Sequence, residues 1–243
     1  MSHDTRTFRT RADDAAVAWL NAAIACGRNK ERKALFRTVS VEFFKSGVQF
    51  VGCDGTMLFR TWAPYCDIGD LPAPMPSWLE RPSEDRVVVA DTDKFALTFM
   101  RTLLPAVGDE PFEMHLSIEP SQDEDAPPLG DELAEYVLVL HALGQRLSCR
   151  LYDGTFPDWR ALQYGIDEAE RVEGMIIAPR ILAAAGKLKG VSGVDCEFMG
   201  DEQAIRFVAH SADPRVAGLL MAMRRLEPRA KKEAESEPEL QPA

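Results

Sequence analysis

Cationic side chains recur at helical spacing in separate stretches of the chain. The candidates for one shared surface are Arg28, Lys30, Lys94, Arg101, Arg180, Lys187 and Lys189. Lys94 and Arg101 are seven residues apart, as are Arg180 and Lys187, so each pair lies on one face of a helix. Such cations hold phosphates without reading base sequence. A solvated helix face explains any single one of them, but their recurrence in three stretches favours binding to the phosphates of DNA.

The overall charge opposes this interpretation, since the formal net charge is −11. Nucleic-acid binding normally requires clustered Lys and Arg, and an acidic chain lacks them on average. Local charge can nevertheless differ from the average. With 46% hydrophobic and 28% charged residues, the composition is that of an ordinary globular protein. No apolar run approaches the roughly 20 residues of a membrane span, and the polar N-terminus does not resemble a signal peptide, so the cytoplasm is the expected compartment.

The residues that usually carry catalysis or metal binding form no recognisable pattern. The four histidines are scattered, and HExxH, P-loop, GxSxG and cofactor-binding motifs are missing from the sequence. The acidic run at 123–125 is interpreted as solvating charge in a loop. The five cysteines are Cys26, Cys53, Cys66, Cys149 and Cys196. They form no CxxC pair, so we expect no metal, no cofactor, no disulfide framework and no enzymatic activity.

These side chains are positioned by a pattern that occurs three times, in which a short strand runs directly into an amphipathic helix. We expect the strands at 7–11, 86–90 and 174–178, and the helices at 13–26, 91–104 and 179–188. Asp13 and Asp91 suit helix N-termini, and Pro179 suits a first helical position. The apolar residues of each helix recur at intervals of three and four, which predicts packing against a sheet.

Three strands are expected after each helix, separated by tight turns. They are predicted at 35–44, 48–53 and 57–62, at 112–118, 136–141 and 146–152, and at 194–198, 204–209 and 216–223. Consecutive strands with tight turns imply antiparallel sheets, and the whole pattern predicts an α+β fold with the helices on one face. We interpret the proline-containing segment 67–85 as an irregular connection, 119–132 as an exposed loop and 228–243 as a disordered tail.

Three segments resemble a known family. Leu151–Arg160 reads LYDGTFPDWR and is similar to the "DGxFPDY" segment of the bacterial replicative sliding clamp, the beta subunit of DNA polymerase III. Upstream, Val51–Leu58 resembles the family's "ATDGHRL". Near the end, Leu220–Arg224 resembles its terminal "VMPMRL", with Ala222 in place of proline. The three segments occur in the family's order.

The resemblance implies a DNA-clamp fold, in which sheets lie outside and helices line a hole around duplex DNA. Residues 1–160 then resemble one complete clamp domain built from two half-units, 6–66 and 86–156. Residues 161–227 resemble only half of the family's last domain. A family ring holds twelve such half-units, and four of these shortened chains would supply that number. Double-stranded DNA, a polymerase and a clamp loader are the partners that the resemblance implies, together with a homo-oligomeric ring.

The resemblance also implies an apolar pocket that receives short linear motifs from those partner proteins. The matching positions are Gly55, Thr56, Met57, Leu58, Pro157, Leu162, Leu219, Leu220, Met221 and Met223. Taken without the resemblance, these are ordinary core and turn residues. The leading functional hypothesis is a processivity clamp. The alternatives are a clamp-like adaptor or decoy that does not encircle DNA and, ranked last, an enzyme on an unrelated α+β fold.

Overall fold

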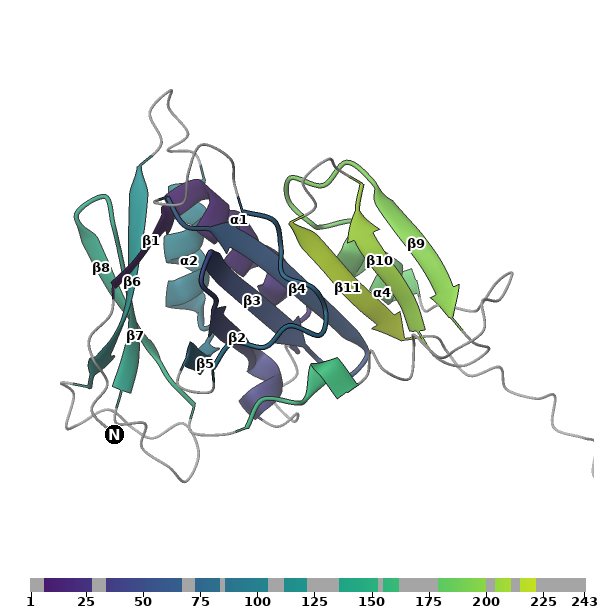
Figure 1. Cartoon of the computed structure of the whole chain (residues 1–243), viewed down its shortest axis with the longest axis horizontal. Coiled ribbons are helices and arrows are strands. Elements are labelled where there is room, and N and C mark those ends of the chain that lie inside the picture. The colour runs from purple at the N-terminus through teal and green to yellow at the C-terminus, as the bar shows by residue number, and fades with distance from the viewer. Residues whose placement is uncertain are drawn as a thin grey trace, which may run out of the picture.

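Three strand-and-helix units follow one another along the chain (Figure 1). The structure is a computed structural model that describes residues 7–27, 34–66, 73–83, 86–104, 112–121, 136–152, 155–161, 179–199, 204–210 and 215–221. The first unit comprises β1 (Thr7–Arg11), α1 (Ala12–Ile24), the 3₁₀ turn η1 (Ala34–Arg37), β2 (Thr38–Phe43), β3 (Gly47–Cys53) and β4 (Met57–Pro64). The second comprises β5 (Val87–Asp91), α2 (Lys94–Leu103), β6 (Glu113–Pro120), β7 (Tyr136–Ala142) and β8 (Gln145–Arg150). The third comprises α4 (Pro179–Ala185), β9 (Val194–Met199), β10 (Ala204–Ala209) and β11 (Val216–Met221).

The first two units exchange their first strands. β1 pairs antiparallel with β6 in a four-stranded sheet of order β1-β6-β7-β8. β5 pairs antiparallel with β2 in a seven-stranded sheet of order β5-β2-β3-β4-β11-β10-β9. Isolated bridges, Thr10 to Tyr65 and Ala90 to Leu151, join the sheets at both corners. Neither unit therefore contains a complete sheet of its own, and each of the two sheets contains strands of both units.

The helices α1 and α2 pack against each other between the two sheets (Figure 1). Their apolar faces join both sheets in one core, which includes Trp19 and Met100 at 0% exposure. The α1 helix lies unusually close to β3, because a Cβ added at Gly52 would be only 1.9 Å from the carbonyl oxygen of Ala22. Only glycine allows this approach of helix and strand.

The third unit extends the seven-stranded sheet through β11, which pairs antiparallel with β4. A Cβ at Gly218 would lie 2.4 Å from the carbonyl oxygen of Leu58, so the absence of a side chain there keeps the two strands in register. α4 covers β10 and β11 in a second apolar cluster that also contains Phe59 of β4. Asn21 of α1 accepts a hydrogen bond from the Lys189 amide and donates one to its carbonyl. These contacts fix the third unit against β4 and α1 of the first unit.

The predicted α+β class and the order of strands and helices are confirmed, but several boundaries were wrong. Residues 34–37 form a 3₁₀ turn, whereas a strand was expected to begin at 35. α2 begins at Lys94, capped by Asp93, and Asp91 ends β5 instead of starting the helix. The Asp93 carboxylate accepts a hydrogen bond from the Ala96 amide. A capping side chain lies two or three residues before the amide that it binds, so Asp93 is correctly placed for this helix and Asp91 is not. The expected strand at 174–178 and the expected tail at 228–243 lie outside the described residues.

Candidate functional site

One open surface cavity of about 850 Å³ collects cations from all three units. It lies where the C-terminal end of α1, the N-terminal end of α2 and the segment after α4 meet. Its cationic lining residues are Arg37, Lys94, Arg101, Lys187 and Lys189. Four of these five are the cations that the sequence pattern placed on one DNA-facing surface. The structure therefore brings them together from positions up to 95 residues apart, counted from Lys94 to Lys189.

Two carboxylates, Asp91 and Asp93, share the cavity with the five cations. Asp93 is committed to capping α2. Burial, and then the neighbouring charge of Asp93, raise the pKa of Asp91. The balance of charge in this cavity is thus cationic, although the chain as a whole is acidic. An anionic polymer would meet a favourable local field here.

The other predicted DNA-facing residues are placed differently. Arg180 is exposed at the start of α4 but does not line the cavity. Arg28 and Lys30 lie outside the described residues. Sequence reasoning missed Arg37, because it lies in a 3₁₀ turn that was expected to be a strand.

The resemblance to the clamp family placed ten residues in one peptide pocket, and the structure places the five of them that lie in strands on two faces of the sheet. Leu58, Leu219 and Met221 join an apolar cluster on the face remote from α4. We call this the outer cluster; it also contains Val51, Cys53, Trp78, Val89, Tyr152, Phe156 and Trp159. Met57 and Leu220 instead pack with α4 on the other face.

The reason for this division is the alternation of side chains along paired strands. Leu219 is opposite Leu58 and Leu220 is opposite Met57, so one pair faces outward and the next faces the helices. Met57 and Leu220 therefore pack on the other face of the sheet from Leu58 and Leu219, and the single peptide pocket that the resemblance implies stays a prediction. Pro157 is half-buried beside the outer cluster, while Leu162 and Met223 lie outside the described residues.

The turn between β3 and β4 has the geometry that an Asp-Gly pair predicts. The Asp54 carboxylate accepts hydrogen bonds from the Thr56 amide at 2.8 Å and from the Met57 amide at 3.0 Å. Gly55 is exposed and has a φ of +82°, which favours glycine. The Thr56 carbonyl accepts from the Met221 amide at 2.9 Å. The turn and the end of β11 thus form one continuous edge beside the outer cluster.

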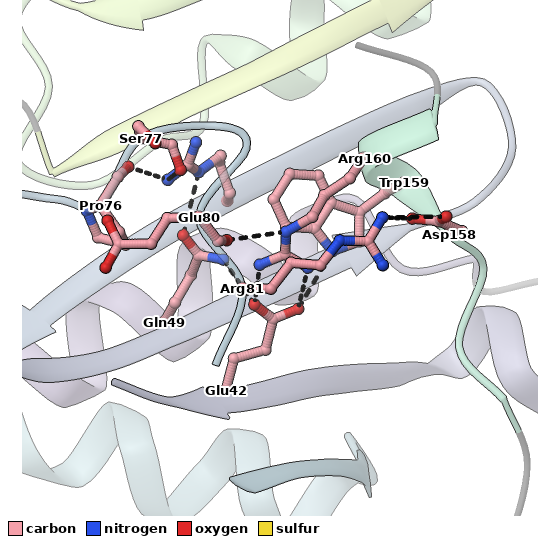
Figure 2. Close-up of polar contacts among 10 residues, drawn as sticks. Glu42, Gln49, Pro76, Ser77, Glu80, Arg81, Asp158, Trp159 and Arg160 are labelled. Carbon is pink, nitrogen blue, oxygen red and sulfur yellow. Dashed lines mark hydrogen bonds and ion pairs between the residues drawn. The ribbon is translucent and has the colours of Figure 1, made fainter. Parts of the chain in front are cut away.

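Next to the outer cluster lies a buried polar network that sequence reasoning missed (Figure 2). Both carboxylate oxygens of Glu42 accept from the Arg160 guanidinium, one of them at 3.1 Å. The Trp159 indole and the Gln49 amide also donate to Glu42, at 3.2 and 2.9 Å. Gln49 in turn accepts from Nε of Arg60 at 3.1 Å. Glu42, Arg60 and Arg160 are 2%, 1% and 7% exposed.

The network holds two connecting segments on the outer face of the seven-stranded sheet. Arg60 donates to the Pro76 and Ser77 carbonyls, and Arg160 donates to the Glu80 carbonyl. The Arg60 guanidinium also lies over the Trp78 ring, 4.6 Å from its centroid. Burial, and then repulsion from Arg160, lower the pKa of Arg60 to about 10. The segments 73–83 and 155–161 are thereby fixed beside Leu58 and Leu219.

The sequence shows only that Glu42, Gln49 and Arg60 are polar residues within strands, which is not enough to predict the network. Glu42, Gln49 and Arg60 occupy the outward positions of β2, β3 and β4, where alternation alone predicts contact with solvent. No nearby residue in the sequence indicates that Trp78, Trp159 and the two segments cover them.

Among the described residues, no group of three or more His, Cys, Asp or Glu side chains could hold a metal ion. No helix in the described part of the chain is long and apolar enough to cross a membrane.

Comparison with known proteins finds similarity in structure but not in sequence families. No protein-family model and no curated sequence matches the chain. Among solved structures, the DNA polymerase sliding clamp of Bacillus subtilis matches 92% of this chain at 14% identity, with a TM-score of 0.57. The clamp of Pseudomonas aeruginosa matches 90% at 12% identity, with a TM-score of 0.56. A putative DNA polymerase III beta subunit of Eubacterium rectale matches 90% at 11% identity, with a TM-score of 0.58.

The chain spans about two thirds of the length of these proteins, namely 65%, 66% and 66%. The similarity includes all three units, since it extends over 90% or more of the chain. At this identity the similarity concerns the fold. The chain has the α+β fold of the bacterial DNA polymerase sliding clamps, in a shortened form.

Proposed function

We propose that this protein is a sliding clamp that encircles duplex DNA as a homo-oligomer and tethers a polymerase to it. The observation that carries the proposal is the cationic cavity. Three helix-bearing units of an acidic chain bring five cations to one concave surface. In a clamp, the helices of these units face the DNA, and phosphate contacts from Lys and Arg hold the duplex without sequence preference.

The outer cluster is the proposed docking site for short linear motifs of the polymerase and the clamp loader. Leu58 and Leu219 form its buried floor at 2% and 1% exposure. Half-buried Met221 and Pro157 offer apolar surface beside them. The adaptable thioether of methionine suits a surface that receives several partners. Peptides bind such surfaces through a few apolar anchor residues.

DNA binding is tested by reversing the charge of three cavity residues, in the variant K94E/R101E/K187E. A matched control, K45E/R81E/R146E, changes the net charge equally at residues that do not line the cavity. The cavity variant should weaken binding and reduce the slope of log K against log salt by about 2–3, since each phosphate contact contributes about 0.9. The control should change both quantities much less. Equal effects of the two variants would show that the cavity is not the DNA surface.

Encirclement is tested separately from affinity. The parent protein, loaded onto nicked circular DNA by its clamp loader, should remain bound in high salt and dissociate within seconds after the circle is linearised. This behaviour requires a closed oligomer, because salt weakens phosphate contacts but does not open a ring. Equal retention on linear and circular DNA would exclude a sliding ring. A stable monomer that still binds polymerase peptides would favour an adaptor that does not encircle DNA.

A further inference from the structure

The helix α2 carries an exposed aromatic ring that core packing does not explain. Among the described residues, five large apolar side chains are exposed, and Phe95, at 62%, is the most exposed of them and the only aromatic one. The buried face of α2 consists of Ala96, Phe99, Met100 and Leu103, so Phe95 is not part of the core. A single exposed apolar residue needs no explanation by itself, but the surroundings of this ring give it one.

Phe95 belongs to the exposed side of α2, which also carries two cations of the cavity. Lys94, Phe95, Thr98, Arg101 and Thr102 are all exposed, and their spacing of three, four and seven residues places them on one side of the helix. Lys94 and Arg101 line the cationic cavity. The Lys94 ammonium nitrogen lies over the Phe95 ring, 5.1 Å from its centroid. The ring therefore lies at the rim of the cavity, beside one of its cations.

The third unit has a cation at the equivalent position. In both helices the buried residues follow one another at intervals of three and four, as Ala96, Phe99 and Leu103 in α2 and as Ile181, Ala184 and Leu188 in α4 and its continuation. This spacing aligns Phe95 with Arg180, which is exposed and was predicted to face DNA. Equivalent positions thus present a phenyl ring in the second unit and a guanidinium in the third.

These two groups bind different parts of a nucleic acid. A guanidinium binds phosphate oxygens, which single-stranded and double-stranded DNA both present. A phenyl ring has no attraction for phosphate but stacks on the face of a base. In a duplex the base faces are covered by neighbouring base pairs, and a ring that enters between them must first unstack them. An unpaired base offers its face without that cost.

We propose that Phe95 is a stacking platform for an unpaired base, so that the cationic cavity receives DNA in which a duplex continues into a single strand. Lys94 and Arg101 hold phosphates of the strand, and Phe95 stacks on one of its bases at the rim. Cations combined with aromatic rings bind single strands in this way without sequence preference. The inference rests on the proposed DNA binding and deepens it, because it names the form of DNA that the cavity receives.

Three DNA probes with the same duplex separate stacking from phosphate contacts. The first is the blunt duplex, the second carries a single-stranded tail of thymidines, and the third carries an abasic tail with the same number of phosphates. The abasic tail keeps the phosphates and their salt dependence but has no base to stack. A stacked base contributes roughly five- to 150-fold in affinity, whatever its identity.

The first experiment measures the affinity of the full chain for each probe by fluorescence anisotropy at one salt concentration. The parent should bind the thymidine tail about fivefold more tightly than the abasic tail, or more. Phe95→Ala should lose this preference and keep the parent's affinity for the blunt duplex to within about twofold, since no unpaired base is present there. Leu79→Ala is the matched control and should keep the preference, because Leu79 is 49% exposed but does not line the cavity. Circular dichroism and analytical ultracentrifugation compare the fold and the mass of each variant with those of the parent.

The second experiment distinguishes stacking from simple apolar burial. Phe95→Leu keeps an apolar side chain without an aromatic face and should lose most of the preference, whereas Phe95→Trp should keep or increase it. In a tail that contains iodouracil, ultraviolet light should cross-link the base to Phe95, and peptide mass spectrometry identifies the attached residue.

Equal binding of the thymidine and abasic tails by the parent, or an unchanged preference in folded Phe95→Ala, would overturn the inference. An equal loss of affinity for all three probes in Phe95→Ala would also overturn it, because the ring would then act on the duplex. A changed mass of that variant would instead assign the ring to a contact between copies of the chain. A preference that depends on Phe95, without retention on circular DNA, would uphold the inference and overturn the proposed ring. A parent that binds none of the probes would overturn both.

Discussion

Replacing Glu42 by glutamine should destabilise the protein more than any other single change of charge among the described residues. The carboxylate is 2% exposed and accepts directly from the Arg160 guanidinium, while Gln49 connects it to the buried guanidinium of Arg60. Glutamine keeps the shape of the side chain but removes its negative charge. Its NH₂ group would also point a donor at donors that now have an acceptor. Arg60 and Arg160 would then repel each other inside the fold without a compensating anion.

The expected loss of unfolding free energy is about 3–5 kcal/mol, the range for breaking a buried ion pair from one side. Glu42 accepts four hydrogen bonds, two of them from Arg160 and one each from Trp159 and Gln49. Bonds to a charged group contribute about 1.5–3 kcal/mol each, so partial relaxation still leaves a loss in this range.

A neighbouring ion pair provides the control. Arg81 and Asp158 meet at 3.3 Å, but their side chains are 57% and 55% exposed. Asp158→Asn should therefore change stability by less than about 1 kcal/mol. The assay is urea unfolding followed by tryptophan fluorescence, at equal protein concentrations because association shifts the apparent stability.

A second variant separates loss of charge balance from loss of packing. Adding Arg160→Met to Glu42→Gln removes the second uncompensated charge and fills the space with an apolar chain. The double variant should be more stable than Glu42→Gln alone. If Glu42→Gln were as mild as Asp158→Asn, or if the double variant lost further stability, the network would not be a balanced buried charge cluster.

Three further predictions follow from the described geometry. Met221→Ala should weaken binding of a polymerase clamp-binding peptide by about 1–3 kcal/mol in calorimetry; Met57→Ala, on the opposite face, should not, and equal effects would contradict the outer cluster as the docking site. Burial raises the pKa of the Cys26 and Cys149 thiols to about 12, so their contribution to stability is complete below pH 9 and is lost as pH rises towards 12. The free energy of unfolding from urea titrations should fall by about 1 kcal/mol per thiol between pH 8 and pH 10, and by less in the double alanine variant. Gly218→Ala should destabilise the fold by on the order of 1–3 kcal/mol through overpacking of the β4–β11 contact, and an unchanged urea midpoint would show that this seam can relax.

The sequence was sufficient for the class of fold and for most elements, because alternation and turn residues are local signals. β10 was predicted with its observed bounds, and Asp54-Gly55 formed the expected turn. The pairing of β1 with β6 and of β5 with β2 could not be predicted from the residues, since it depends on contacts across the whole domain. The clamp resemblance supplied site positions but not the orientation of the side chains, so it did not indicate that Met57 packs with α4 while Leu58 packs in the outer cluster.

In the candidate site too, the sequence indicated residue types and spacing but not the long-range contacts of single side chains. The sequence pattern proposed Lys94, Arg101, Lys187 and Lys189 for one surface, and the structure places all four at one cavity and adds Arg37. Glu42 was recognisable only as an outward polar residue of a strand. Its burial depends on Arg160 and on segment 73–83, whose prolines indicated only an irregular connection.

The exchange of first strands also has a consequence for folding during synthesis. β1 leaves the ribosome well before its partner β6, since Arg9 and Glu113 are 104 positions apart in the sequence. At a translation rate of about 5–20 residues per second, β1 waits roughly 5–20 seconds for its partner. Throughout this interval its backbone donors and acceptors are open to pairing with other nascent chains. The first two units therefore have a high contact order and should fold slowly, and a chaperone bound to β1 during synthesis would raise the yield of folded protein.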